Sequence, residues 1–280
     1  MNSSIRRILV PLDPSGYTDA ALRLAARLAR VHCAQVEGLV VLDSPGIRSD
    51  IAPVEMVGWP LVYDYVRKAV EEAEAEVTRL KDKFAEFCDG QGLSHLEAEL
   101  QGMPADLILE VASLFDLVVM GLRTYFHFET RSGPGESLDR VLRRTVTPVL
   151  AVPEAGPEEF RRVLIAYDGS LASARAMRDC LEVLRGGEVE LTLFAADRDE
   201  SQAKTLVRHA ATCLRAHGYR DFAVKTSVEP AIDLVKRDFL GQVDLIVAGI
   251  HARHPLKDAF VGSFTHELIR SGRTALLLSH

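Results

Sequence analysis

The chain has 280 residues, a formal net charge of −7, and 48% hydrophobic and 26% charged residues. These proportions are typical of a soluble globular protein of about two domains. The acidic balance argues against a general nucleic-acid binder, and the chain lacks the ~18-residue apolar run that a membrane helix needs. The chain begins with a few polar residues ahead of an expected strand and has four dispersed cysteines without a CxxC pair. We therefore expect no signal peptide and a cytoplasmic protein.

The first half alternates short apolar runs with segments of helical periodicity. Ile8–Leu12 is continuously apolar, which is typical of a strand buried on both faces of a parallel sheet. The remaining elements are expected, in chain order, as a helix over 18–31, a strand over 35–42, a long loop over 43–60, a helix over 61–88, a strand over 96–100, a helix over 104–114, a strand over 117–120, a helix over 137–144 and a strand over 148–152.

After a Pro- and Gly-containing linker at 153–157, the second half repeats this order. Its elements are expected as a strand over 163–166, a helix over 172–184, a strand over 189–195, a helix from about 201, a strand over 222–227, a helix over 231–239, a strand over 245–248, a loop over 249–262, a helix over 263–271 and a strand over 274–278. This alternation predicts an α/β fold with two tandem, doubly wound, five-stranded parallel sheets. We place the domains at 1–153, including the long loop 43–60, and 154–280.

Two motifs occur once in each half. Ile8–Asp13 returns as Val163–Asp168, and Asp116–Gly121 returns as Asp244–Gly249. Each half thereby places an acidic residue after its first strand and a glycine after its fourth. Open α/β sheets bind ligands at these carboxyl ends of the strands.

The second half has the better candidate site. Gly249 follows a strand and allows close approach of the backbone to a ligand, and Gly262-Ser263 opens a helix whose free N–H groups favour a phosphate. Ser263 and Thr265 offer hydroxyl donors, and Asp168 offers an acceptor for a ribose or an adenine. The alternative is purely structural, with Ser263 capping its helix and Gly249 turning the chain.

Together these segments resemble the tandem universal stress proteins, within the wider adenine-nucleotide α-hydrolase-like group. The resemblance covers nearly the whole chain and includes Val261–Ser263 and the terminal strands Val146–Val152 and Thr274–Leu278. It implies two Rossmann-like domains of UspA type, paired through their last strands as an internal pseudo-dimer. It also implies an adenine nucleotide as ligand, with ATP the leading candidate.

The resemblance also implies site residues. In the second half these are Ala166, Tyr167, Asp168, Ser170, Phe194, Ala248, Gly249, His251, Ala252, Gly262, Ser263, Phe264 and Thr265. The less closely matching first-half set is Leu12, Asp13, Val41, Gly121, Gly135 and Ser137.

The nucleotide-binding members carry G-x2-G-x9-G-[ST] after strand four, and both halves depart from it. Ala252 replaces the second glycine in the second half, and Glu136 follows Gly135 in the first half, where a carboxylate would repel a phosphate. Glu229 also replaces a small residue close to the expected ligand. The first half departs further, because Thr124 stands at the position of the second glycine and the loop is one residue longer. The second half is therefore favoured as the nucleotide site.

Several functions remain open at this point. The leading hypothesis is nucleotide binding in a stress response with little or no turnover, and the main alternative is a module without nucleotide that acts through surfaces and unknown protein partners. ATP hydrolysis has little support, because Asp168 is the one apparent catalytic group. A hydrophobic ligand beside Met56, Val57, Trp59 and Leu61 is a further possibility. No metal site, catalytic residue, nucleic-acid partner or membrane partner is expected, and a homodimer of the chain remains possible.

Overall fold

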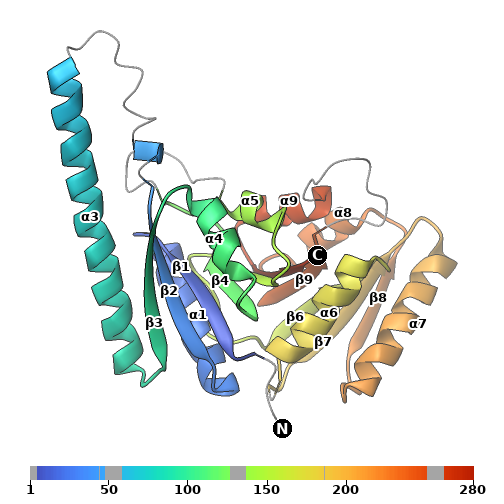
Figure 1. Ribbon diagram of the computed structural model, residues 1–280. Helices are drawn as coiled ribbons and strands as arrows, with labels where there is room; N and C mark the ends of the chain where they lie inside the picture. Colours follow the sequence, from blue (N-terminus) through green and yellow to red (C-terminus); the bar gives the residue numbers. More distant parts are fainter. Residues whose placement is uncertain (1–4, 44, 48–58, 127–136, 186, 251–261) are drawn as a thin grey trace.

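The computed structural model describes residues 5–43, 45–47, 59–126, 137–185, 187–250 and 262–280. Their strands form one ten-stranded sheet in the order β3-β2-β1-β4-β5-β10-β9-β6-β7-β8. Figure 1 shows the two halves of the chain side by side along this sheet, with the long helix α3 at one end and α7 at the other. The sheet is parallel except where β5 and β10 meet.

The elements follow the expected order. Those of the first half are β1 (Arg7–Leu12), α1 (Gly16–His32), β2 (Gln35–Leu42), α3 (Trp59–Gly90), β3 (His95–Gln101), α4 (Pro104–Ala112), β4 (Leu117–Gly121), α5 (Ser137–Leu142) and β5 (Val149–Val152). Those of the second half are β6 (Arg162–Ala166), α6 (Leu171–Val183), β7 (Glu190–Ala196), α7 (Glu200–Ala216), β8 (Ala223–Ser227), α8 (Ala231–Asp238), β9 (Leu245–Gly249), α9 (Ser263–Ser271) and β10 (Ala275–Ser279).

The largest difference from the expected elements concerns the segment 43–60. Residues 45–47 are helical and α3 already begins at Trp59, so the stretch is not loop throughout. Helix α4 ends two residues before the expected Leu114, because bonds from Leu114 N to Val111 O and from Phe115 N to Ala112 O tighten its last turn. The proposed hydrophobic-ligand residues Met56 and Val57, and the side chains of Trp59 and Leu61, lie outside the described residues.

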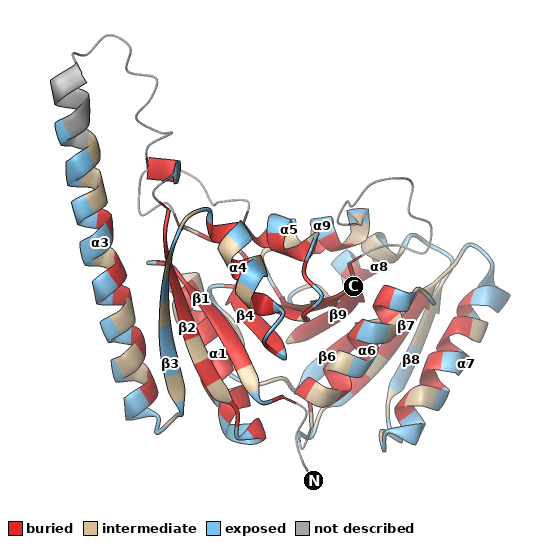
Figure 2. Ribbon diagram, viewed as in Figure 1, coloured by how far each residue is buried: buried red, intermediate tan, exposed pale blue. Residues whose placement is uncertain are grey.

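Each face of the sheet is covered by four helices. One buried cluster contains side chains of α1, α3, α6 and α7, and the other contains side chains of α4, α5, α8 and α9. Figure 2 shows the buried central strands between more exposed strands at the two ends of the sheet. The end strand β3 alternates in burial, which matches its alternating sequence His-Leu-Glu-Ala-Glu-Leu-Gln. Central strands such as β4 are buried throughout and continuously apolar.

The repeated aspartates Asp116 and Asp244 bind backbone at the opposite ends of the strands from the candidate site. One carboxylate oxygen of Asp116 accepts the N–H groups of Arg6 (2.7 Å) and Arg7 (2.9 Å). Asp244 does the same for the N–H groups of Arg161 (2.9 Å) and Arg162 (2.8 Å). These two motif residues therefore hold the starts of β1 and β6 in place.

The two halves meet where β5 and β10 pair in antiparallel fashion. The register places Leu276 opposite Ala151, Leu277 opposite Leu150, and Leu278 opposite Val149. The side chains of these residues are fully buried. Since each strand would otherwise present unpaired N–H and C=O groups at an edge, this pairing removes two apolar edges. Among the described residues, the structure has no helix long and apolar enough to cross a membrane.

We expect Leu277→Ala to lower the free energy of unfolding by about 2–5 kcal/mol, because it leaves a cavity at the centre of the β5–β10 pair. Urea denaturation followed by circular dichroism measures the change. Val146→Ala is the matched control, since Val146 is 82% exposed, and its expected change is within about 0.5 kcal/mol. Equal effects of the two substitutions would contradict the importance of this junction.

Asp179 makes the stability at the β5–β10 junction depend on pH. Burial is the main cause that raises the pKa of this carboxyl, and the hydroxyl of Ser279 on β10 donates to it at 2.7 Å, which partly offsets the rise. A carboxyl with a raised pKa in the folded state binds more protons folded than unfolded, so its contribution to stability falls as pH rises above about 4.

We therefore expect Asp179→Asn to gain stability relative to the wild type as pH rises from about 4 to 7. The asparagine still accepts the Ser279 hydroxyl but carries no buried charge. Urea denaturation of both proteins at several pH values measures the difference. A difference that is constant with pH would refute this interpretation.

Candidate functional site

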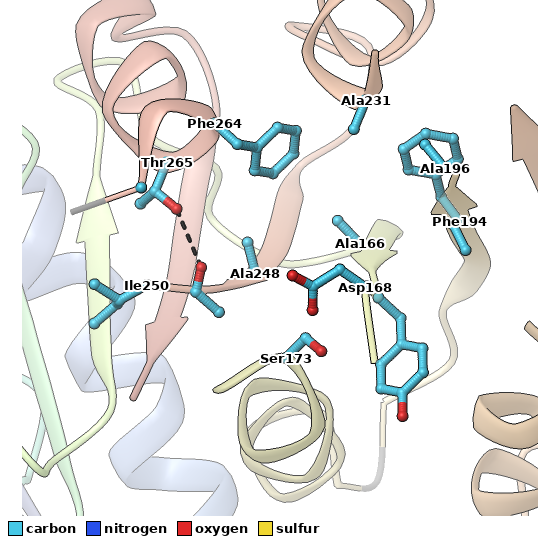
Figure 3. A pocket seen from close by; sticks show the side chains of 14 residues that line it. Ala166, Asp168, Ser173, Phe194, Ala196, Ala231, Ala248, Ile250, Phe264 and Thr265 are labelled. Atoms are coloured by element: carbon cyan, nitrogen blue, oxygen red, sulfur yellow. Dashed lines mark hydrogen bonds between the residues drawn. The ribbon is translucent and has the colours of Figure 1, made fainter. Parts of the chain in front are cut away.

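The carboxyl ends of β6, β7 and β9 surround a cavity of about 200 Å³ in the second half (Figure 3). Helices α6, α8 and α9 complete its wall. The residues that line it are Ala166, Tyr167, Asp168, Ser173, Phe194, Ala195, Ala196, Ala231, Ala248, Gly249, Ile250, Gly262, Phe264 and Thr265. The cavity lies at the end of the sheet where α/β proteins bind ligands.

Small side chains create this cavity. Ala166 and Ala196 end β6 and β7, and Ala248 is the last residue but one of the adjacent strand β9. Figure 3 shows these alanines around a space bounded by Phe264 and Asp168. The internal repeat and the strand register place Pro11, Val41 and Met120 at the corresponding positions of the first half. The larger first-half side chains therefore fill volume that the second half leaves open.

Hydrogen-bond acceptors dominate the polar part of the cavity. Asp168 accepts the N–H of Ser170 with one carboxylate oxygen (2.9 Å), and its other oxygen has no hydrogen bond within the described part of the chain. The hydroxyl of Ser173 donates to the carbonyl of Ser170 (3.0 Å), and that of Thr265 donates to the carbonyl of Gly249 (3.1 Å), the dashed line in Figure 3. Because both hydroxyl protons are used, these oxygens are left to accept, and the cavity suits ligand amino and hydroxyl groups.

The N-terminus of α9 borders the same cavity. The helix starts at Ser263 after Gly262, and no side chain caps it. The structural alternative for Ser263 is therefore wrong, because Gly262 and not Ser263 occupies the cap position. The Ser263 side chain is exposed and does not line the cavity. The uncapped first turn has free N–H groups for an acceptor.

Gly249 is required by packing within the protein. A Cβ at this position would lie 2.5 Å from the backbone N of Ser173 and 2.8 Å from the carbonyl carbon of Ala172. At Gly121, the first-half counterpart, a Cβ would lie 2.6 Å from both Arg123 O and the Cβ of Tyr17. Close contact with the first helix of each half therefore explains both glycines, and at Gly121 the following segment adds to it. The expected approach of a ligand is not needed to explain them.

In the first half, the repeated aspartate is bound by its own chain. Asp13 is buried, and one carboxylate oxygen accepts the N–H of Ser15 (3.0 Å) and the hydroxyl of Thr18 (2.7 Å). Its other oxygen accepts the N–H of Tyr125 (2.6 Å), which comes from the segment after β4. The ring of Phe126 is buried in the same cluster as Val41. Asp13 therefore has bonding partners where Asp168 has an open oxygen.

The structure separates the expected site residues into three groups. Most of the second-half set lines the cavity, whereas Ser170 instead caps α6 by accepting the N–H of Ser173 (3.0 Å). Leu12, Val41 and Ser137 of the first-half set are buried. His251, Ala252 and Gly135 lie outside the described residues.

Five lining residues were missed by the sequence reasoning. These are Ser173, Ala195, Ala196, Ala231 and Ile250. The internal repeat offered one signal, because Ser173 corresponds to Thr18 and both follow the repeated aspartate by five residues. The alanines gave no signal of their own, because an alanine in a buried strand is typical of ordinary core packing.

Residues 4–153 match the model of the Universal stress protein family. The chain belongs to the universal stress protein family. No curated protein matches the chain significantly.

Among solved structures, this universal stress protein is similar to one from Archaeoglobus fulgidus DSM 4304, with 18% identity, 99% of this chain and 98% of that chain covered, and a TM-score of 0.70. It is also similar to a putative universal stress protein from Pseudomonas aeruginosa UCBPP-PA14, with 16% identity, 99% and 93% covered, and a TM-score of 0.61. A universal stress protein from Archaeoglobus fulgidus in complex with dAMP matches 52% of this chain and 96% of its own, with 19% identity and a TM-score of 0.37. The full-length similarities support the α/β fold.

We expect Gly249→Ala to destabilise this universal stress protein by about 1–3 kcal/mol, because the new methyl group would press on backbone atoms that cannot rotate away. Thermal and urea unfolding measure the loss. Gly90→Ala is the matched control, because a Cβ there meets nothing within 4 Å. A stable Gly249→Ala variant would show that the β9–α6 contact adjusts freely.

Proposed function

We propose that the second half of the chain binds an adenine nucleotide, with ATP the leading candidate, and that binding rather than turnover serves a stress response. The base and ribose would occupy the alanine-lined cavity, and the phosphates would lie toward the N-terminus of α9. The main support for the proposal is the cavity itself, which lies in the second half, near the ends of strands that carry small residues.

The shape and chemistry of the cavity suit the nucleoside part of this ligand. Phe194 and Phe264 offer ring surfaces, and the alanines offer a shallow apolar floor. The open oxygen of Asp168 and the hydroxyl oxygens of Ser173 and Thr265 accept hydrogen bonds, which matches ribose hydroxyls and an exocyclic amine.

The phosphates of the nucleotide would lie outside the enclosed part of the cavity. A cavity of about 200 Å³ is smaller than the roughly 300–1,000 Å³ of typical ligand sites, so it accommodates only part of a nucleotide. Among the described lining residues there is no lysine or arginine, so backbone N–H groups at the uncapped start of α9 would supply the phosphate contacts. Glu229, the acidic replacement near this site, pairs with Arg237 at 3.1 Å, which offsets its repulsion.

We expect one nucleotide site per chain, because the first half differs from the second at the residues of the site. Asp13 is bonded on both oxygens and Met120 replaces Ala248, so the first half would serve as a structural partner to the second. The domain boundaries at 1–153 and 154–280 and a cytoplasmic location belong to the same proposal.

Little or no turnover is expected from the described residues of the site. Asp168 and Tyr167 are the titratable side chains among them. Asp168 is held by the N–H of Ser170, and apart from Tyr167 the described lining residues include no second acid or base that could activate a water.

We expect Ala248→Met to weaken ATP binding at least tenfold, because the first-half residue would fill the second-half cavity. Isothermal titration calorimetry with ATP measures the change, and thermal unfolding confirms that the variant is folded. Val146→Met, at an exposed position away from the cavity, is the control and should bind as the wild type does.

Two results would overturn the proposal. Unchanged ATP affinity in the Ala248→Met variant would place the ligand elsewhere. Failure of the wild type to bind ATP at millimolar concentration would favour the alternative, a stress protein without nucleotide that acts through surfaces and protein partners.

A further inference from the structure

A groove of about 280 Å³ lies between α1, the end of α3 and the linker, and it shares no lining residue with the nucleotide cavity. It is lined by Arg23, Ala26, Arg27 and Arg30 of α1, by Phe87 and Gln91 at the end of α3, and by Glu158 of the linker between the halves. The three arginines follow i, i+4 and i+7 spacing and therefore share one side of α1. They are exposed to solvent.

Two glutamates of the linker offset part of the charge of the three arginines, because Glu158 lines the groove and Glu159 contacts Arg27. Arg27 pairs with Glu159 of the linker at 2.7 Å, and Arg30 donates to the neutral amide oxygen of Gln91 at 2.6 Å. Arg23 has no ion pair among the described residues. Glu159 is moreover shared with Arg161, which is the main cause that lowers the pKa of the Glu159 carboxyl.

The second half differs at the corresponding positions. The internal repeat aligns Arg23, Arg27 and Arg30 with Arg178, Glu182 and Arg185. Glu182 pairs with Arg185 at 2.6 Å, so a carboxylate of the same stretch of chain offsets part of the positive charge there. In the first half, Arg27 stands at the position of Glu182. Like charges at this spacing weaken a helix. The arginines are also unexpected in a chain whose net charge is −7.

We propose that this groove binds a small oligophosphate, a ligand with two or three linked phosphate groups. Guanidinium groups bind phosphate oxygens in a bidentate manner. Arg23 and Arg30 are about 10 Å apart along the helix, so several linked phosphates match the stripe better than one does. Phe87 forms one wall of the groove.

In this arrangement the carboxylate of Glu159 competes with the phosphate for Arg27. Its carboxylate already contacts the central guanidinium, and the incoming phosphate must displace it from Arg27. The linker between the two halves would thus be released from α1 when the groove is occupied.

The test is calorimetric titration of the full chain with inorganic tripolyphosphate, which lacks the base and ribose of the nucleotide site. The triple variant Arg23→Gln, Arg27→Gln and Arg30→Gln should weaken binding at least tenfold. The matched control Arg178→Gln, Arg208→Gln and Arg220→Gln changes net charge equally at exposed positions and should stay within twofold of the wild type. Glu159→Gln should strengthen binding severalfold.

Each contrary outcome overturns the proposal. Equal losses in the two triple variants would mean general charge attraction, and no loss in the groove variant would place the phosphate elsewhere. A poly-glutamate peptide that binds with equal affinity and the same dependence on the groove arginines would make the occupant an acidic protein segment.

Discussion

The antiparallel pairing of β5 with β10 is the contact on which the rest of the molecule depends. Each strand is short, and both are apolar except for Ser279 at the end of β10. Each half of the sheet ends in one of them. Joined, they make a continuous ten-stranded sheet with helices on both faces and no unpaired apolar strand at its centre. The less apolar strands β3 and β8 are then left at the two ends, where alternating or polar side chains tolerate solvent.

The two halves share one order of helices and strands but differ in the chemistry of their side chains. At the carboxyl ends of the strands, a change from Pro11, Val41 and Met120 to three alanines separates a filled core from a cavity. The repeated aspartate follows the same division. Both carboxylate oxygens of Asp13 accept hydrogen bonds from its own chain, whereas one carboxylate oxygen of Asp168 has no hydrogen bond within the described residues.

The first helices of the two halves also differ in their ion pairs. Glu182 of α6 pairs with Arg185 just after the helix, whereas Arg27 of α1 pairs with Glu159 of the linker. Since exposed ion pairs contribute only about 0–1 kcal/mol, an incoming multivalent anion competes with Glu159 at little cost in stability. The linker is therefore a connection whose contacts depend on what occupies the groove.

The sequence by itself determined the order of strands and helices, because continuous apolar runs and helical periodicity are local signals. It also indicated the family and the importance of Asp168, Gly249 and the start of α9, because these residues stand in repeated motifs. The relation between distant residues was decided only by the tertiary structure. Gly249 is explained by the backbone of Ser173 lying against it, and Asp13 is closed by the N–H of Tyr125. Likewise, Ala196 and Ala231 became cavity residues because separate elements bring small side chains together, and the volume left between them depends on packing rather than on any one segment.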